Sequence, residues 1–124
     1  MITYTKNDIE SHDDERGFLR VIPNNKVIQR AIYCTGNPKA IRGSHVHLED
    51  SHYCYVTKGT IRYEYRDSDT TPIQVAILQP GDMVFTPPGE IHRFVFVTHG
   101  AFIALSTLPR TQESYEHDTT KKTF

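Results

Sequence analysis

Three of the chain's seven histidines fall within residues 41–59, which read IRGSHVHLEDSHYCYVTKG. His45 and His47 are one residue apart, and because side chains alternate across a β-strand, both imidazoles are expected on one side, roughly 7 Å apart along the chain. Imidazole titrates near neutral pH, so such a pair can move protons on a substrate. The same pair can ligate one metal ion or fill a purely structural place on the strand. The spacing alone leaves these readings open.

A second block, GDMVFTPPGEIHRFVF, begins at Gly81 and carries another histidine after a Pro-Pro-Gly corner. Five residues separate Gly81 from Pro87, and two separate Gly89 from His92. Phe94 shares strand parity with His92, so an apolar wall is expected beside this histidine. Such a wall suits a sugar face or a small organic ligand, which makes His92 and Phe94 candidate substrate-binding residues.

Together the two blocks resemble the paired motifs of the cupin superfamily, G-x5-HxH-x3-4-E-x6-G and G-x5-PxG-x2-H-x3-N. The motif positions that match are His45, His47, Gly59, Gly81, Pro87, Gly89 and His92. Three positions depart from the pattern: Lys39 replaces the opening glycine, His52 stands at the acidic position, and Phe96 replaces the closing asparagine. The resemblance implies an all-β double-stranded β-helix, the jelly-roll barrel of the cupins.

Metal-binding cupins hold an ion with three histidines and a glutamate, so the resemblance also implies a candidate ligand set. Here the equivalent residues are His45, His47, His52 and His92. Neutral imidazoles can hold a divalent transition metal. This gives one alternative, a metal-binding cupin acting as a small dioxygenase or isomerase. If His52 is a ligand, the set of four is complete. The alternative is that His52 hydrogen-bonds a neighbouring carbonyl and has only a structural role.

Three further segments narrow the resemblance to the dTDP-4-keto-6-deoxyhexose 3,4-ketoisomerases and the related dTDP-sugar epimerases. They are DERGFLRVI at residues 14–22, IQRAIYCTGNPKAIRGSHVH at residues 28–47, and the tail ESYEHDT. Members of that group work without a metal and pair through their N-terminal strands into dimers. The resemblance therefore implies an isomerase without cofactor, a nucleotide-sugar substrate and a homodimer. A non-catalytic cupin that binds a sugar is the remaining alternative.

Moving a ketone from C4 to C3 of a hexose requires a base for the C3 proton and an acid at C4. By position within the resemblance, His45 and His47 share these roles, and Tyr33 contacts the enediolate oxygen. Arg16 contacts the anionic intermediate or the pyrophosphate, and Arg42 is a second candidate because guanidinium pairs well with phosphate oxygens. Without the resemblance, Tyr33 reads as a packed aromatic and Arg16 as a solvated charge in a turn.

Short strands separated by turn residues must position these side chains. Ile61, Tyr63 and Tyr65 alternate with charged residues in TIRYEYRD, which predicts a strand with one buried face. About eight such strands, with turns every 8–12 residues, predict an antiparallel sandwich or closed barrel. We expect one domain, residues 1–124, with its barrel core at about 22–105. Residues 109–124 are expected to form a polar C-terminal extension with at most a short helical turn.

The bulk composition excludes several classes of function. The net charge is −1 and no long basic run occurs, so nucleic-acid binding has no support. No apolar run approaches the roughly 20 residues that span a bilayer, so no membrane partner is expected. The start MITYTKNDIE lacks the features of a secretion signal, which makes a cytoplasmic location the expectation. The two cysteines form no CxxC pair and are expected as reduced thiols.

Overall fold

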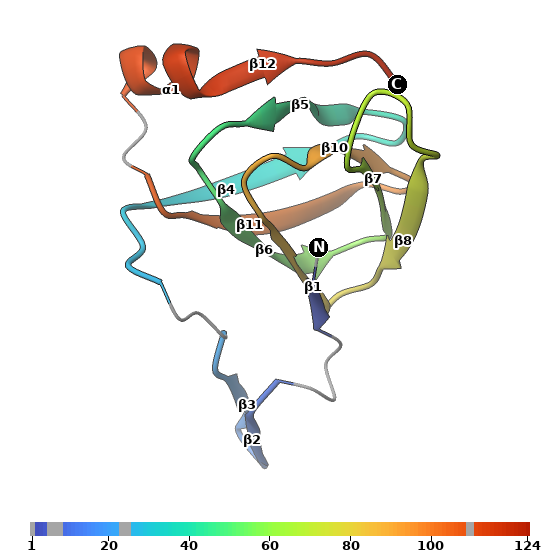
Figure 1. The fold of residues 1–124 in the computed structure, drawn as a ribbon. Helices are drawn as coiled ribbons and strands as arrows, with labels where there is room; N and C mark the ends of the chain where they lie inside the picture. Colours follow the sequence, from blue (N-terminus) through green and yellow to red (C-terminus); the bar gives the residue numbers. More distant parts are fainter. Residues whose placement is uncertain (1, 5–8, 23–25, 109–110) are drawn as a thin grey trace.

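The computed structural model describes residues 2–4, 9–22, 26–108 and 111–124 (Figure 1). Two five-stranded antiparallel sheets face each other, as the predicted all-β barrel requires. The first sheet has the order β1 (Ile2–Tyr4), β9 (Met83–Thr86), β6 (His52–Lys58), β11 (Gly100–Ser106) and β4 (Arg30–Gly36). The second has the order β12 (Thr119–Lys121), β5 (Ile41–His47), β10 (Ile91–Phe96), β7 (Ile61–Arg66) and β8 (Gln74–Leu78).

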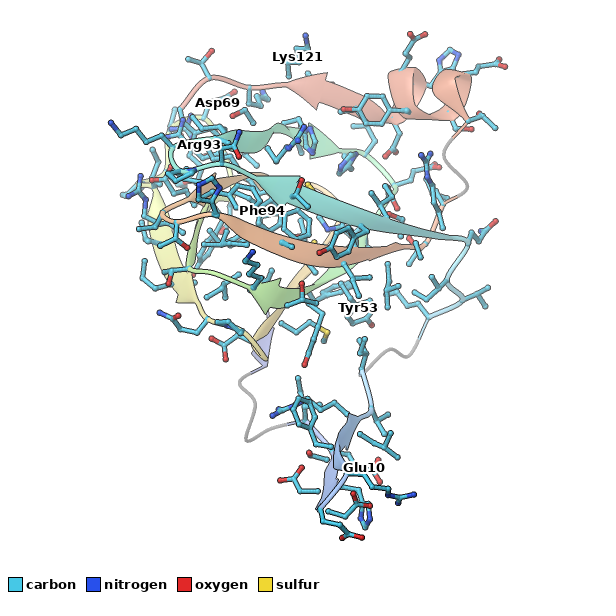
Figure 2. The ribbon with its side chains drawn as sticks, turned by 180° about the vertical axis from the view of Figure 1, so that it is seen from behind. Glu10, Tyr53, Asp69, Arg93, Phe94 and Lys121 are labelled. Carbon is cyan, nitrogen blue, oxygen red and sulfur yellow. The ribbon has the colours of Figure 1, made fainter. Side chains whose placement is uncertain are left out.

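Aromatic and aliphatic side chains fill the space between the sheets. Ile61 and Tyr63 on β7 are fully buried, as the alternation predicts. Tyr65 is only partly buried, whereas Glu64 is buried and pairs with arginines. Phe94 on β10 stacks on Phe102 of β11 with ring centres 4.7 Å apart, and Figure 2 shows Phe94 between the sheets. Burying each such side chain stabilises the fold by roughly 1.5–3 kcal/mol. Part of this core lies directly against the histidines, since the rings of Tyr63 and Phe94 both contact that of His92.

A smaller core covers the outer face of the first sheet. Tyr53 on β6 packs there with Met83, Phe85 and Ile9. The tyrosine therefore faces the side opposite to His52 and Cys54, as strand alternation predicts. Because Ile9 lies between β1 and the arm, this part of the N-terminal segment contributes to the outer core and is tied to the sheet.

The arm, residues 11–20, is a hairpin of β2 (Ser11–Asp14) and β3 (Gly17–Arg20) that projects from the barrel (Figure 1). Its apolar side chains lie in solvent: Phe18 is 60% exposed and Leu19 72% exposed. Figure 2 shows Glu10 at the start of the same projection, well away from the sheets. The arm adds nothing to the core of its own chain.

The C-terminal residues are more ordered than the predicted short helical turn. Helix α1 (Gln112–Asp118) begins at the N-cap Thr111, whose side chain accepts a hydrogen bond from Ser114 N. Strand β12 follows directly and pairs with β5, placing Thr119 opposite His47. The barrel sheet therefore extends beyond the expected limit at residue 105. In the described residues, no helix has the length and apolarity needed to cross a membrane.

Candidate active site at the open end of the barrel

Four imidazoles meet inside the barrel. His45 and His47 come from β5, His52 from β6 and His92 from β10. The ring centres of His45 and His47 are 4.4 Å apart, and those of His45 and His92 are 4.7 Å apart. His52 lies 5.2 Å from His92 by the same measure. The expectation that His45 and His47 share one side of their strand is confirmed.

A β-bulge in β5 aims these side chains. His92 pairs with His45 while the next residue, Arg93, pairs with Gly43, so Ser44 is an extra residue in the strand. Gly43 and Ser44 both have positive φ, 92° and 62°. A side chain at Gly43 would also crowd the backbone of Arg93. The bulge shifts the alternation by one residue and brings Arg42 onto the same side as His45.

His47 is held by the C-terminal extension. Its Nδ1 lies 3.3 Å from Asp118 Oδ2 and 3.1 Å from Thr119 Oγ1, and the ring is 2% exposed. The Asp118 carboxylate also accepts the backbone N–H of Glu49 at 2.7 Å and that of Asp50 at 3.2 Å. A carboxylate fixed in this way orients the imidazole and stabilises it when it is charged. Nε2 is therefore the nitrogen that His47 offers to a ligand.

His92 is oriented by the backbone just before its strand and by the buried side chain of Tyr63. Its Nδ1 lies 3.0 Å from the carbonyl of Glu90, and Tyr63 stacks against the ring at 6.1 Å. The Tyr63 hydroxyl bonds Thr86 Oγ1 at 2.7 Å and donates to Glu90 at 3.3 Å. Burial raises the pKa of Tyr63 well above its usual value, and the Glu90 carboxyl raises it further. Burial also raises the pKa of Glu90.

The structure groups three of the four predicted metal ligands. One nitrogen each of His45, His47 and His92 lies within 4.8 Å of the others, which is a spacing that one metal ion can bridge. Hydrogen bonds at Nδ1 of His47 and His92 are the outer contacts usual for metal-ligating imidazoles. His52 falls outside this group, and its Nδ1 lies 3.2 Å from Cys54 Sγ. The predicted four-imidazole set is thus reduced to three residues that fit a metal.

A cavity of about 130 Å³ lies between the two sheets, beside the imidazoles. Its lining includes His45, His92, Phe94 and Arg42, so the residues predicted to bind substrate line one pocket. Arg42 lies at the exposed mouth and donates to the carbonyl of Thr35 at 3.1 Å. A larger groove, about 500 Å³, lies on the other side of Asp118, beside α1. The smaller cavity is the chemically relevant one because three of the four imidazoles, those of His45, His52 and His92, line it.

Two predicted catalytic residues lie outside this site. Tyr33 is 66% exposed, because its neighbours Ile32 and Cys34 are the β4 residues that face the cavity. Arg16 sits at the tip of the arm, where its side chain is 84% exposed and pairs with Asp14 at 2.6 Å. The prediction of Tyr33 in the pocket was wrong by strand parity. Arg16 lies away from the pocket of its own chain, because the arm projects from the barrel (Figure 1).

Two residues of the C-terminal extension belong to the site although the sequence analysis, which used the tail ESYEHDT only for the resemblance, gave them no role. Asp118 contacts His47, and the Tyr115 ring centre lies 6.5 Å from that of His45 and 6.4 Å from that of His47. Their spacing of three residues puts both on one face of α1. That spacing was the available signal, but a seven-residue helix in a polar tail gives no reason to expect it against the barrel.

Comparison with known proteins agrees with the resemblance of the two sequence blocks to the cupin motifs. The family model for the cupin domain matches residues 33–108, more than half of the chain. The chain belongs to the cupin family. Among curated proteins, no sequence matches this cupin significantly.

Several solved structures share the fold at low sequence identity. A 3,4-ketoisomerase from Helicobacter canadensis is 19% identical, with a TM-score of 0.79 over 92% of this chain and 86% of that one. A histidine-to-asparagine mutant of the 3,4-ketoisomerase QdtA from Thermoanaerobacterium thermosaccharolyticum, in complex with TDP-4-keto-6-deoxyglucose, is 16% identical, with a TM-score of 0.75 over 92% and 83%. The Mycobacterium tuberculosis rmlC epimerase is 13% identical, with a TM-score of 0.77 over 96% and 66%. These likenesses establish a shared fold.

Proposed function

We propose that this cupin is a nucleotide-sugar 3,4-ketoisomerase, or a closely related epimerase, that acts on a dTDP-4-keto-6-deoxyhexose. The observation that carries the proposal is the close pair His45 and His47, of which His45 lines a partly apolar cavity and His47 is held by Asp118. The fold shared with ketoisomerases and an epimerase supports the same substrate class. Two adjacent imidazoles suit a reaction that removes one proton and returns one.

The residues divide the reaction as follows. The C3 proton of a 4-keto sugar is acidified by the adjacent carbonyl, and His47 Nε2 removes it while Asp118 stabilises the imidazolium. His45, protonated, delivers a proton to C4, and the 4.4 Å ring separation lets the proton on His47 return to His45. The carbonyl oxygen at C4 must also gain a proton while O3 loses one. Neither imidazole serves this exchange while both are engaged at carbon.

Arg42 is the proposed contact for the diphosphate. It is an exposed cation at the cavity mouth, and its guanidinium donates a hydrogen bond to the carbonyl of Thr35 on the preceding strand, β4. Guanidinium groups bind phosphate oxygens through charge-assisted hydrogen bonds. Phe94, Phe102 and Ala104 form an apolar wall of the same cavity, against which the hexose would lie.

The proposed assembly is a homodimer in which the arm of one protomer packs on the other. Phe18 and Leu19 are exposed apolar residues on a hairpin that finds no cover on its own chain. Arg16, at the tip of this hairpin, would then serve the partner's pocket. Light scattering on the whole protein tests the dimer, and replacing Phe18 and Leu19 by serine should yield monomer. A wild-type monomer would refute this assembly.

Turnover is tested with dTDP-4-keto-6-deoxyglucose in D2O, followed by NMR of the sugar. We expect a 3-keto product that carries deuterium at C4, and deuterium at C3 of the substrate that returns from the intermediate; both should be lost in His47→Gln. The exposed His99 provides a matched control, because His99→Gln removes an imidazole from a surface turn. Substrate that stays unchanged with wild-type protein would refute the proposed function.

A second candidate, a metal-binding cupin, is favoured by the convergence of His45, His47 and His92. These residues would hold a divalent transition metal, which supplies Lewis-acid or redox chemistry when bound. Elemental analysis of protein purified without a metal-affinity tag tests this function. Stoichiometric metal that is lost in His92→Ala would favour it, and absence of metal together with sugar turnover would exclude it. A non-catalytic sugar-binding cupin would show sugar-nucleotide binding with neither metal nor turnover.

A further inference from the structure

The proposed reaction needs a hydroxyl donor for the sugar oxygens, and the structure narrows the choice to one. Tyr33, which the family resemblance favoured, lies on the outer face of β4 and is 66% exposed. Two tyrosines of the described chain have rings in contact with the imidazole cluster, Tyr63 and Tyr115. The Tyr63 hydroxyl is committed to Thr86 and Glu90 in the buried interior. Tyr115 is therefore the candidate donor.

Tyr115 is placed over the two histidines that carry the proposed chemistry. Its ring stands nearly perpendicular to that of His45, at 79°, and at 65° to that of His47. Asp118, three residues later on the same helix face, is bonded to His47 and fixes α1 against the cluster. Tyr115 and His45 are only partly buried, whereas His47, His52 and His92 are buried. The accessible side of the cluster is thus the side that Tyr115 shares with His45.

We propose that Tyr115 is a catalytic residue of this cupin that contacts the O3 and O4 oxygens of the sugar; the inference rests on the proposed function. When His47 removes the C3 proton, the C3–C4 double bond forms and the Tyr115 hydroxyl gives its proton to O4. The resulting phenolate takes the proton of the O3 hydroxyl as the C3 carbonyl forms and His45 protonates C4. One proton has then moved from C3 to C4 and one from O3 to O4, and the tyrosine is restored.

Tyr115→Phe removes only the hydroxyl and keeps the ring against the histidines. Loss of one donor to a developing oxyanion typically lowers kcat about 10²–10³-fold. We expect a loss of this size in kcat for Tyr115→Phe with dTDP-4-keto-6-deoxyglucose, and little change in KM. The rival variant, Tyr33→Phe, should stay within about threefold of wild type. Thermal unfolding of each variant verifies that the fold is kept.

The NMR assay in D2O adds a readout that a structural role would not move. Without the donor, the intermediate should return to substrate more often. The amount of recovered substrate that carries deuterium at C3, relative to the amount of product formed, should therefore rise in Tyr115→Phe. Active wild type with an unchanged Tyr115→Phe, or with the loss in Tyr33→Phe instead, overturns this inference alone. Wild type that gives neither exchange nor product overturns the proposed function and this role with it. If Tyr115→Phe unfolds, Tyr115→Met, which keeps an apolar side chain of similar length, must show the same loss.

Discussion

Asp118→Asn is the substitution that most directly tests how the C-terminal extension serves the site. Asparagine keeps the shape of the side chain, and its carbonyl can still accept the Glu49 and Asp50 N–H groups. It removes the negative charge that lies 3.3 Å from His47 Nδ1. The imidazolium that forms when His47 removes a proton then loses its counter-charge, while Thr119 still contacts the same nitrogen.

The size of the effect follows from this distance. Two unit charges at 3.3 Å interact by about 5 kcal/mol at an effective dielectric constant of 20. The carboxylate shares its charge with two backbone N–H groups, so about half of this energy, roughly 2–3 kcal/mol, is the expected loss. At 1.36 kcal/mol for each factor of ten, kcat should fall roughly 30–150-fold.

Steady-state turnover of the dTDP-4-keto sugar measures this effect, with urea unfolding to show that the variant is folded. Glu113→Gln is a matched control, because it removes the same charge from an exposed position on the same helix. It should leave kcat within about twofold of wild type. A folded Asp118→Asn protein with kcat within threefold of wild type would refute the argument that Asp118 acts through His47.

Three further predictions concern the cavity mouth, a buried carboxyl and the core. Arg42→Ala should raise KM for the nucleotide sugar about 10–100-fold with a smaller change in kcat, since a hydrogen bond to a charged group contributes about 1.5–3 kcal/mol; an unchanged KM would place the diphosphate elsewhere. Burial raises the pKa of Glu90 above its usual 4.5, so the ionised form destabilises the fold at neutral pH. Glu90→Gln should therefore be more stable than wild type at pH 7.5, with an advantage that shrinks as the pH falls towards 4.5; urea unfolding at both pH values tests this, and a constant difference contradicts it. Gly36→Ala should lower the free energy of unfolding by about 1–3 kcal/mol, because its Cβ would overlap the Phe96 ring. Adding Phe96→Leu to the same chain should recover part of the loss, and thermal unfolding measures both effects. A neutral Gly36→Ala, or no recovery in the double variant, would contradict this prediction.

Local patterns in the sequence were sufficient for the barrel and the imidazole cluster. Alternation in strands such as β7 marks buried faces directly, because side chains on a strand alternate between its two sides. The intervals around His45, His47 and His92 indicated one site through their resemblance to the paired cupin motifs. The same alternation did not place Tyr33, since the residues of β4 that face inward are set by how the strand pairs with β11.

What the sequence by itself determined is therefore the family, the two-sheet barrel, and a cavity that His45 and His92 share with Arg42 and Phe94. Tertiary structure decided which residues complete the site. The bulge at Ser44 moved Arg42 to the side of His45, and the pairing of β12 with β5 carried Asp118 and Tyr115 to His47. Asp118 contacts a residue 71 positions earlier in the chain. A contact at that separation is set by the packing of the whole chain, which local spacing does not encode.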